Sequence, residues 1–292
     1  MKKSIFLLIA LFLVSYVFAQ SEEITFKAKE IRAGGQERTY FNINNNSEPI
    51  ASQVLNAYGK VISQEGIIPD CIAKAYYDDG SLAHESCFAS NQLDGADKGY
   101  FENGNISSEA NYDRGLLSGT SKVYSLNGYI AKENNYKDDM LNGISREYNE
   151  KGILITEMTF INDILNGSYK IYNDYGKIKR IDNYLNGNLE GLSKEYYANG
   201  ILQKETIYQE GTINGIIKEY SPTGIILSER NYRDGMLSGK SKEYYVNGKL
   251  KCEATYLSDK LNGYYTEYDE SGRVIISVYY KNGNKSKAPQ KK

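Results

Sequence analysis

The chain has 292 residues, of which 40% are hydrophobic and 25% are charged, with a formal net charge of −2. This balance excludes a disordered polyelectrolyte and a basic nucleic-acid-binding domain. The 28 tyrosines and 27 glycines favour strands and turns, and the single histidine, His84, excludes most metal and acid–base sites.

Residues 1–19 have the pattern of a secretory signal peptide. Lys2 and Lys3 precede an apolar run that ends in Val17-Phe18-Ala19, which fits a cleavage site. The run is shorter than the ~20 residues that a membrane span needs, which disfavours the alternative of an uncleaved anchor. No cysteine follows the site, so a lipoprotein signal is not indicated. We expect cleavage after Ala19 and export to an oxidising compartment: the periplasm, the cell surface or the medium.

Residues 20–70 are predicted to form an N-terminal cap with a polar, Asn-rich connector at 42–46. Ile24, Phe26 and Ala28 alternate with polar residues, as in a strand. The sequence Gly-Lys-Val at 59–61 resembles part of the repeat described next, and we interpret it as a degenerate copy.

A 24-residue repeat fills residues 71–286. Nine units follow one another without insertion or deletion, the first starting at Cys71 and the others at a glycine every 24 residues. We number these repeats 1 to 9 and their positions 1 to 24. Position 6 is always Tyr, position 10 always Gly, position 12 always aliphatic and position 18 always aromatic; position 15 is Glu in seven repeats. Such self-similarity is typical of repeat architectures.

Each repeat is predicted to form a β-hairpin, with strands at positions 3–7 and 11–18. A two-residue type I′ loop is possible at positions 8–10, but Pro222 at position 8 favours a three-residue loop, a type I turn ending in a left-handed glycine. That loop places position 6 opposite 12 and position 1 opposite 17. Side chains alternate along a strand, so the conserved apolar positions 6, 12 and 18 would share one face.

Two sets of residues follow from this register. The predicted core stripe is Tyr76, Leu82, Phe88, Tyr100, Ile106, Tyr112, Tyr124, Ile130, Tyr136, Tyr148, Leu154, Phe160, Tyr172, Ile178, Tyr184, Tyr196, Leu202, Tyr208, Tyr220, Ile226, Tyr232, Tyr244, Leu250, Tyr256, Tyr268, Val274 and Tyr280. The predicted turn glycines are Gly80, Gly104, Gly128, Gly152, Gly176, Gly200, Gly224, Gly248 and Gly272.

One hairpin is too small to be stable alone. The nine hairpins are therefore predicted to pair edge to edge into an all-β, single-layer antiparallel sheet, an elongated solenoid-like ribbon. Residues 287–292 form a basic tail.

The pattern G-x-x-K-E-Y-x-x-N-G-x-L-x-x-E-x-x-Y-x-x-G-x-L-N resembles the variant MORN repeat of bacteria over residues 71–286. Classical MORN repeats are slightly shorter and carry a fuller Gly-x-Gly pattern with Tyr or Trp. The resemblance implies a ribbon of stacked hairpins used for scaffolding, protein binding or, in some eukaryotic proteins, lipid contact. Cytoplasmic bacterial relatives are often labelled antitoxin components, and the signal peptide departs from that setting.

No catalytic or metal site is predicted, and no cofactor. One histidine cannot supply His-Glu-x-x-His, and the chain has no Cys-x-x-Cys. His84 is expected to be a surface residue. No Gly-rich loop leads into a helix, so phosphate binding is not supported.

The recurrent glutamates are predicted to be solvated ladders on the face away from the tyrosines, with a weak cation-binding row as the alternative. The position-6, 12 and 18 stripe is expected to form the core, or in part to remain accessible to a partner. Position 7 is aromatic in only four repeats, which makes Tyr77, Phe101, Tyr197 and Tyr245 candidates for partner contacts.

Cys71 and Cys87, at positions 1 and 17 of repeat 1, are predicted to form a disulfide that pins the N-terminal end of the array. The alternative is three free thiols. Cys252 would remain unpaired.

The sequence favours an exported, non-enzymatic repeat protein that acts as a protein-binding or scaffolding surface. The alternative is an antitoxin or immunity-like protein that covers a toxin. A glycan hydrolase would need a catalytic domain, and residues 20–70 are too few and too polar to form one. We expect a protein partner, no nucleic acid and no transmembrane segment after signal cleavage; lipid or glycan contact is unsupported.

Overall fold

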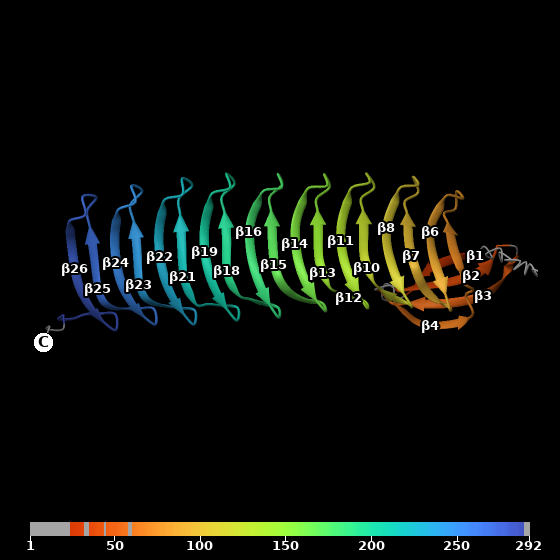
Figure 1. The fold of residues 1–292 in the computed structure, drawn as a ribbon, viewed down its shortest axis with the longest axis horizontal. Helices are drawn as coiled ribbons and strands as arrows, with labels where there is room; N and C mark the ends of the chain where they lie inside the picture. The colour runs from red at the N-terminus through yellow and green to blue at the C-terminus, as the bar shows by residue number, and fades with distance from the viewer. Residues whose placement is uncertain (1–23, 32–34, 44, 58–59, 289–292) are drawn as a thin grey trace, which may run out of the picture. The chain divides into compact units, whose positions relative to one another are not determined.

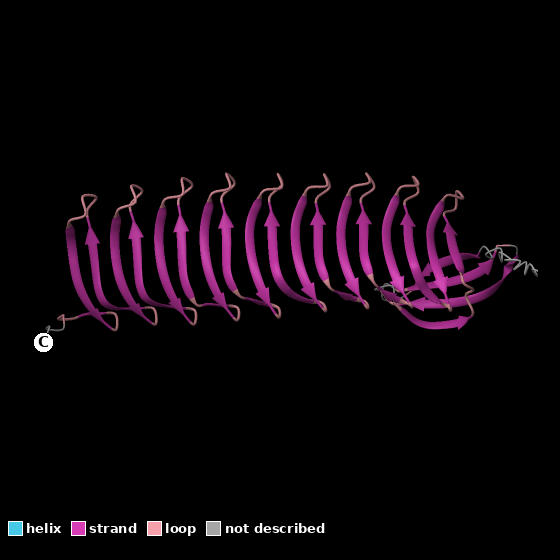
Figure 2. Cartoon of the chain, viewed as in Figure 1, coloured by secondary structure: helices cyan, strands magenta, loops and turns pink. Residues whose placement is uncertain are grey.

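The computed structural model describes residues 24–31, 35–43, 45–57 and 60–288 (Figure 1). The predicted signal peptide lies outside these residues. The described part is all-β, as expected, and its 27 strands belong to one open sheet with almost entirely antiparallel pairing (Figure 2). It contains no helix that is long and apolar enough to cross a membrane. The chain divides into two compact units, the first made of residues up to Ala75 with Cys87–Asn91 and the second of Tyr76–Ser86 with the residues from Gln92 onward.

The first unit is an antiparallel meander of β1 (Ile24–Glu30), β2 (Gln36–Asn42), β3 (Asn45–Leu55) and β4 (Val61–Gly66). Strand β1 also pairs in parallel with β5 (Cys71–Tyr76), through Ile24 with Ala73.

The core of this unit forms around Tyr40, which is fully buried. The ring of Tyr40 packs 5.5 Å from Phe26 and 5.6 Å from Phe88, measured between ring centroids. Its hydroxyl donates to Oε1 of the buried Gln53 at 2.7 Å, which satisfies both polar groups. The predicted cap therefore has a small hydrophobic core, which includes Phe88 from repeat 1.

The hairpin β3–β4 has the register of the repeats. Leu55 pairs with Val61, and the register then shifts so that Val54 pairs with Ser63. The same shift recurs in repeats 2 to 9, as described below. The interpretation of this segment as a degenerate repeat stays a prediction.

The second unit is a row of hairpins that contains most of the second strand of repeat 1 and the complete hairpins of repeats 2 to 9 (Figure 1). Its strands are β6 (Leu82–Ala89), β7 (Gln92–Tyr100), β8 (Ile106–Asp113), β9 (Leu116–Leu117), β10 (Gly119–Tyr124), β11 (Ile130–Lys137), β12 (Met140–Leu141), β13 (Gly143–Tyr148), β14 (Leu154–Ile161), β15 (Ile164–Tyr172), β16 (Ile178–Leu185), β17 (Asn188–Leu189), β18 (Gly191–Tyr196), β19 (Leu202–Gln209), β20 (Thr212–Ile213), β21 (Gly215–Tyr220), β22 (Ile226–Arg233), β23 (Met236–Tyr244), β24 (Leu250–Leu257), β25 (Lys260–Tyr268), β26 (Val274–Lys281) and β27 (Asn284–Lys285).

The loop inside each hairpin is the three-residue type, as predicted. In repeat 4 the amide of Gly152 donates to the carbonyl of Asn149 at 2.9 Å, and the amide of Asn149 donates to the carbonyl of Ile153 at 2.9 Å. Gly152 has φ of 74°, in the left-handed region, and Tyr148 pairs with Leu154. All nine predicted turn glycines have positive φ.

A one-residue β-bulge directly beyond this pair changes the rest of the register. Glu147 pairs with Thr156, so the residue between Leu154 and Thr156 has no partner across the hairpin. Position 1 consequently lies opposite position 18 rather than 17, as in the pair Gly143 and Phe160. The same register holds in repeats 2 to 9.

A second, two-residue turn at positions 20 and 21 connects successive repeats. In repeat 4 Ile161 pairs with Ile164 across Asn162 and Asp163, whose φ values are 48° and 65°. Positive φ at both central residues defines a type I′ turn, whose twist suits an antiparallel pair. All nine repeats have positive φ at both positions.

The bulge divides the predicted core stripe between the two faces of the sheet. Position 18 lies on face A, with positions 3, 5, 14, 16 and 23, whereas position 6 lies on face B, with positions 2, 4, 12, 15, 17, 19 and 22. The prediction that Tyr148, Leu154 and Phe160 share one face is therefore wrong for Phe160. The prediction that Glu157 lies away from Tyr148 is also wrong, because one extra residue reverses the alternation.

Candidate binding surfaces

The recurrent glutamates on face B bind the tyrosine of the next repeat. The position-6 hydroxyl donates to the position-15 carboxylate of the preceding repeat at 2.7 Å for Tyr100 with Glu85, and at 3.0 Å for Tyr220 with Glu205. Three further pairs repeat this bond: Tyr124 with Glu109, Tyr244 with Glu229, and Tyr268 with Glu253. These glutamates are therefore not the purely solvated ladder that was predicted. They connect neighbouring hairpins.

This arrangement stabilises the neutral phenol. Burial, and then the hydrogen bond to the carboxylate, raise the pKa of Tyr100, Tyr124 and Tyr220 to about 12. In repeat 4 the carboxylate of Glu157 instead binds Lys170 at 2.8 Å and Arg146 at 2.9 Å. The bond to Lys170 is the main reason that the pKa of Glu157 lies below its usual value.

Three of the four predicted partner-contact residues have a hydroxyl that is used inside the sheet. Tyr77, Tyr197 and Tyr245 donate to the main-chain carbonyl of the next repeat's position 6, at 2.6, 2.7 and 2.8 Å. Their side chains and that of Phe101 are half-buried. Direct contact of these residues with a partner stays a prediction.

In the repeats with an aromatic residue at position 7, the side chain at position 9 caps the turn instead. In repeat 4 the Asn149 side chain at position 7 accepts from the amides of Lys151 and Ile153. In repeat 6, where position 7 is Tyr197, the cap is Asn199 at position 9, which accepts from the amide of Ile201. The same replacement occurs in the other repeats with an aromatic position 7, which use Asp79, Asn103 and Asn247.

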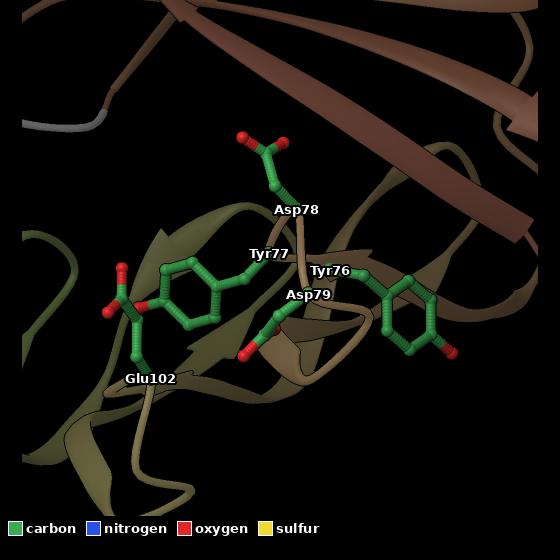
Figure 3. A pocket seen from close by; sticks show the side chains of 5 residues that line it. All are labelled: Tyr76, Tyr77, Asp78, Asp79 and Glu102. Atoms are coloured by element: carbon green, nitrogen blue, oxygen red, sulfur yellow. The ribbon is translucent and has the colours of Figure 1, made fainter.

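A shallow hollow of about 380 Å³ lies beside the loop of repeat 1. It is lined by Tyr76, Tyr77, Asp78, Asp79 and Glu102, and the two tyrosine rings point in opposite directions (Figure 3). Its carboxylates make it acidic. Among the described residues no group of three His, Cys, Asp or Glu side chains has the geometry of a metal site.

His84 is half-buried rather than a surface residue. Its Nε2 lies 2.8 Å from Oδ1 of Asp97, and the buried Ser86 hydroxyl donates to the same oxygen. A serine nucleophile needs the histidine between the serine and the aspartate. Here the aspartate lies between them, so the cluster does not have the arrangement of a triad.

The predicted disulfide rested on position 1 lying opposite position 17. The bulge moves position 1 opposite position 18 in repeats 2 to 9, and in β6 the buried residues are Ser86 and Phe88, with the half-buried Cys87 between them on the alternate side. Cys87 and Cys252 carry free thiols, so the cross-link from Cys87 to Cys71 is not formed in the structure. Burial raises the pKa of the Cys252 thiol, which disfavours its reactive thiolate.

Asparagine at position 17 is a connecting residue that the sequence analysis did not identify. The Asn135 side-chain amide donates to the carbonyl of Ile144 at 2.7 Å, and Asn183 donates to Leu192 at 2.9 Å. Its recurrence in repeats 2, 3, 5 and 7 was the available signal.

Exposed aliphatic side chains gather on face B near the type I′ turns of repeats 4 to 6. Ile161 pairs with Ile164, and each is 49% exposed. Leu192 pairs with Ile207, and these are 37% and 36% exposed. We define the apolar band as Ile144, Ile161, Ile164, Leu185, Leu192 and Ile207.

The repeats match a known family. The model of the MORN repeat variant matches residues 93–114, 141–162, 189–210, 213–234, 237–257 and 261–282. The chain is a MORN-repeat protein. Repeats 3 and 5 of this MORN protein lie outside the matches, but their hairpins β10–β11 and β15–β16 have the same register and bulge as the matched ones.

No curated protein matches the chain. Among solved structures, it is similar to the crystal structures described as TcdB2-TccC3-Cdc42 and TcdB2-TccC3-TEV, with 12% and 11% identity and a TM-score of 0.15 for each. The alignments cover 85% and 87% of this chain and 17% of each of those chains. At this TM-score the likeness carries no argument.

Proposed function

We propose that this MORN-repeat protein is an exported, non-enzymatic protein that binds a protein partner along the apolar band of face B. MORN repeats often take part in binding. The observation that carries the proposal is the concentration of half-exposed aliphatic side chains on one face of neighbouring repeats. Contiguous apolar surface of this kind is typical of interaction sites.

Physical chemistry supports contact at the band. The side chains project from hydrogen-bonded strands, so the backbone loses little conformational freedom when a partner binds. Burying apolar surface contributes about 25 cal/mol per Å² before those losses. The flanking Asn135 and Asn183 hold the backbone of Ile144 and Leu192 in place, which preorganises the surface.

The non-enzymatic part of the proposal draws on the cluster of Ser86, Asp97 and His84, in which the aspartate, and not the histidine, lies between the other two side chains. The export part draws on the sequence of residues 1–19. N-terminal sequencing of protein recovered from outside the cytoplasm tests it. A chain that begins at Gln20 supports export, and a cytoplasmic chain that begins at Met1 contradicts it.

Affinity capture with a matched pair of variants tests the binding surface. The bait with Ile161→Lys and Leu185→Lys should lose a protein that the unchanged chain retains, with a dissociation constant raised roughly tenfold or more. The control bait carries Leu126→Lys and Val246→Lys in the hairpin loops, where the side chains are 59% and 77% exposed. It should bind like the unchanged chain. Equal binding by both variants would contradict the proposed surface.

The antitoxin-like alternative stays a prediction of the sequence. A toxin-like gene beside this one, and neutralisation of its product by the purified protein, would favour it.

A further inference from the structure

In the part of the chain that the structure describes, the outer edge of β26 lacks the next-repeat partner that inner strands have. In inner repeats, positions 14 and 15 pair with positions 5 and 4 of the next repeat, as Lys132 pairs with Glu147 and Glu133 with Arg146. Within the described residues β26 pairs with β25 on one side and with the two-residue β27 (Figure 1). Residues 287–292 do not continue the period, because they lack the glycine of position 1 and the tyrosine of position 6.

The backbone groups that face outward on β26 follow from one hydrogen bond. The amide of Ser286 donates to the carbonyl of Tyr279 at 2.9 Å, from the side away from β25. Backbone groups of alternate residues in a strand point to the same side. The amide and carbonyl of Ser277 therefore point outward as well, at the centre of the strand.

The side chains of β26 suit pairing with a further strand. Residues 274–280, VIISVYY, carry no charge and are β-branched or aromatic apart from Ser277. Val274, Ile275 and Ile276 are 58%, 59% and 44% exposed. Natural sheet edges usually carry charges, proline or a cover that prevents such pairing.

The geometry points to a second copy of this chain as the partner of this edge. The two copies would pair antiparallel through their β26 strands, about a two-fold axis at Ser277. Such an axis places position 15 of one copy opposite position 15 of the other. Seven repeats have Glu at position 15, and two carboxylates there would repel. Repeat 9 has Ser277, so the two edges meet without like charges.

The same axis creates favourable cross-strand pairs. Ile276 lies opposite Val278 of the second copy, and the axis repeats this pair on the other side of Ser277, so that both pairs lie on face A. Pairs of β-branched residues stabilise antiparallel strands. A two-fold axis pairs the same edge of both copies, so the contact uses both β26 edges and leaves neither for a third copy. A closed two-fold dimer results.

Sedimentation equilibrium of the purified protein measures the association. The unchanged chain should show a mass of two chains at micromolar concentration. Ser277→Glu should raise the dimer dissociation constant roughly tenfold or more. Ser277→Thr, a strand-favouring change without charge, should leave the dimer intact. Far-UV circular dichroism and the melting temperature establish that each variant is folded.

Cross-linking tests the position of the axis. Directly opposed residues of an antiparallel pair have Cα atoms about 5.5 Å apart, within reach of a disulfide. Ser277→Cys should give a covalent dimer under oxidation, whereas Val246→Cys should not. A monomeric unchanged chain, an undiminished dimer in Ser277→Glu, or equal cross-linking at both positions would overturn the inference.

Discussion

At the residue scale, the carboxylate at position 15 acts between repeats as well as within one. It accepts the phenol of the next repeat on face B and lies beside the lysine or arginine at position 4, as Glu205 lies beside Lys194. The bond between Tyr220 and Glu205 therefore connects the hairpins of two adjacent repeats. Repeat 5 has Ile181 at position 15, so the position-6 tyrosine of repeat 6, Tyr196, has no carboxylate there.

Tyr220→Phe should lower the free energy of unfolding by about 1 kcal/mol, because the Glu205 carboxylate loses a donor. Tyr196→Phe is the matched control and should have a smaller effect. Urea unfolding followed by circular dichroism measures both. Equal losses in the two variants would show that the inter-repeat hydrogen bond does not contribute.

Gly176→Val should destabilise the protein by about 1–3 kcal/mol. Gly176 has φ of 74°, which a β-branched residue resists, and an added Cβ would lie 3.5 Å from Cγ2 of Ile153. The contact distance is ordinary, so the cost should come from the backbone. Gly176→Asn should cost less, because asparagine tolerates the left-handed region. Thermal melting separates the variants, and an unchanged melting temperature in Gly176→Val would contradict this explanation.

At the element scale, the two turns of a repeat have different requirements. The type I′ turn needs positive φ at two residues, which asparagine, aspartate and glycine supply. The three-residue loop needs one left-handed glycine and a side-chain cap from position 7 or position 9. This choice of cap explains why position 7 varies between aromatic and polar residues.

The exchange of caps is testable in repeat 4. Asn149→Tyr should destabilise the hairpin by about 1 kcal/mol, because the amides of Lys151 and Ile153 lose their acceptor. Adding Lys151→Asn should recover most of that loss, because repeat 6 uses the same combination of Tyr197 and Asn199. Chemical denaturation of the single and double variants gives the two values. No recovery in the double variant would mean that the cap does not transfer.

At the scale of the whole molecule, the tyrosine–glutamate hydrogen bonds connect repeats 1 to 3 and repeats 6 to 9, and they couple stability to alkaline pH. The folded pKa of Tyr100, Tyr124 and Tyr220 is raised to about 12, above an unfolded value of about 10. A raised folded pKa favours the protonated phenol in the folded state. This stabilisation is therefore complete below about pH 10 and is lost as the pH rises toward 12.

The urea midpoint should consequently fall between pH 10 and 12. Phenolate absorbance at 295 nm should titrate later in the folded chain than in the chain unfolded in urea. The variant Tyr100→Phe, Tyr124→Phe, Tyr220→Phe should show a weaker dependence over the same range. Identical phenolate titration in the folded and unfolded chains would rule out this coupling.

Much of the array could be predicted because each element depends on local sequence. The 24-residue period, the hairpin in each unit, the left-handed glycine of the loop and the pairing of positions 6 and 12 all follow from residues within a few positions of each other. The type I′ turn was also readable, from Asn186-Gly187, Asp234-Gly235 and Asn282-Gly283, although only a connecting turn was expected.

The faces of the sheet were decided by the tertiary structure. Position 13 is the unpaired residue of the bulge. It is Ala, Ser, Ile, Lys, Gln or Leu in different repeats, so no residue type identifies the bulge in the sequence. Side chains alternate with a period of two, and one unpaired residue therefore exchanges the faces of everything beyond it. That exchange brings Glu205 to Tyr220 and places Phe160 on the face opposite Tyr148. The sequence by itself determined the repeat and its turns, whereas hydrogen bonding between strands determined which side chains meet.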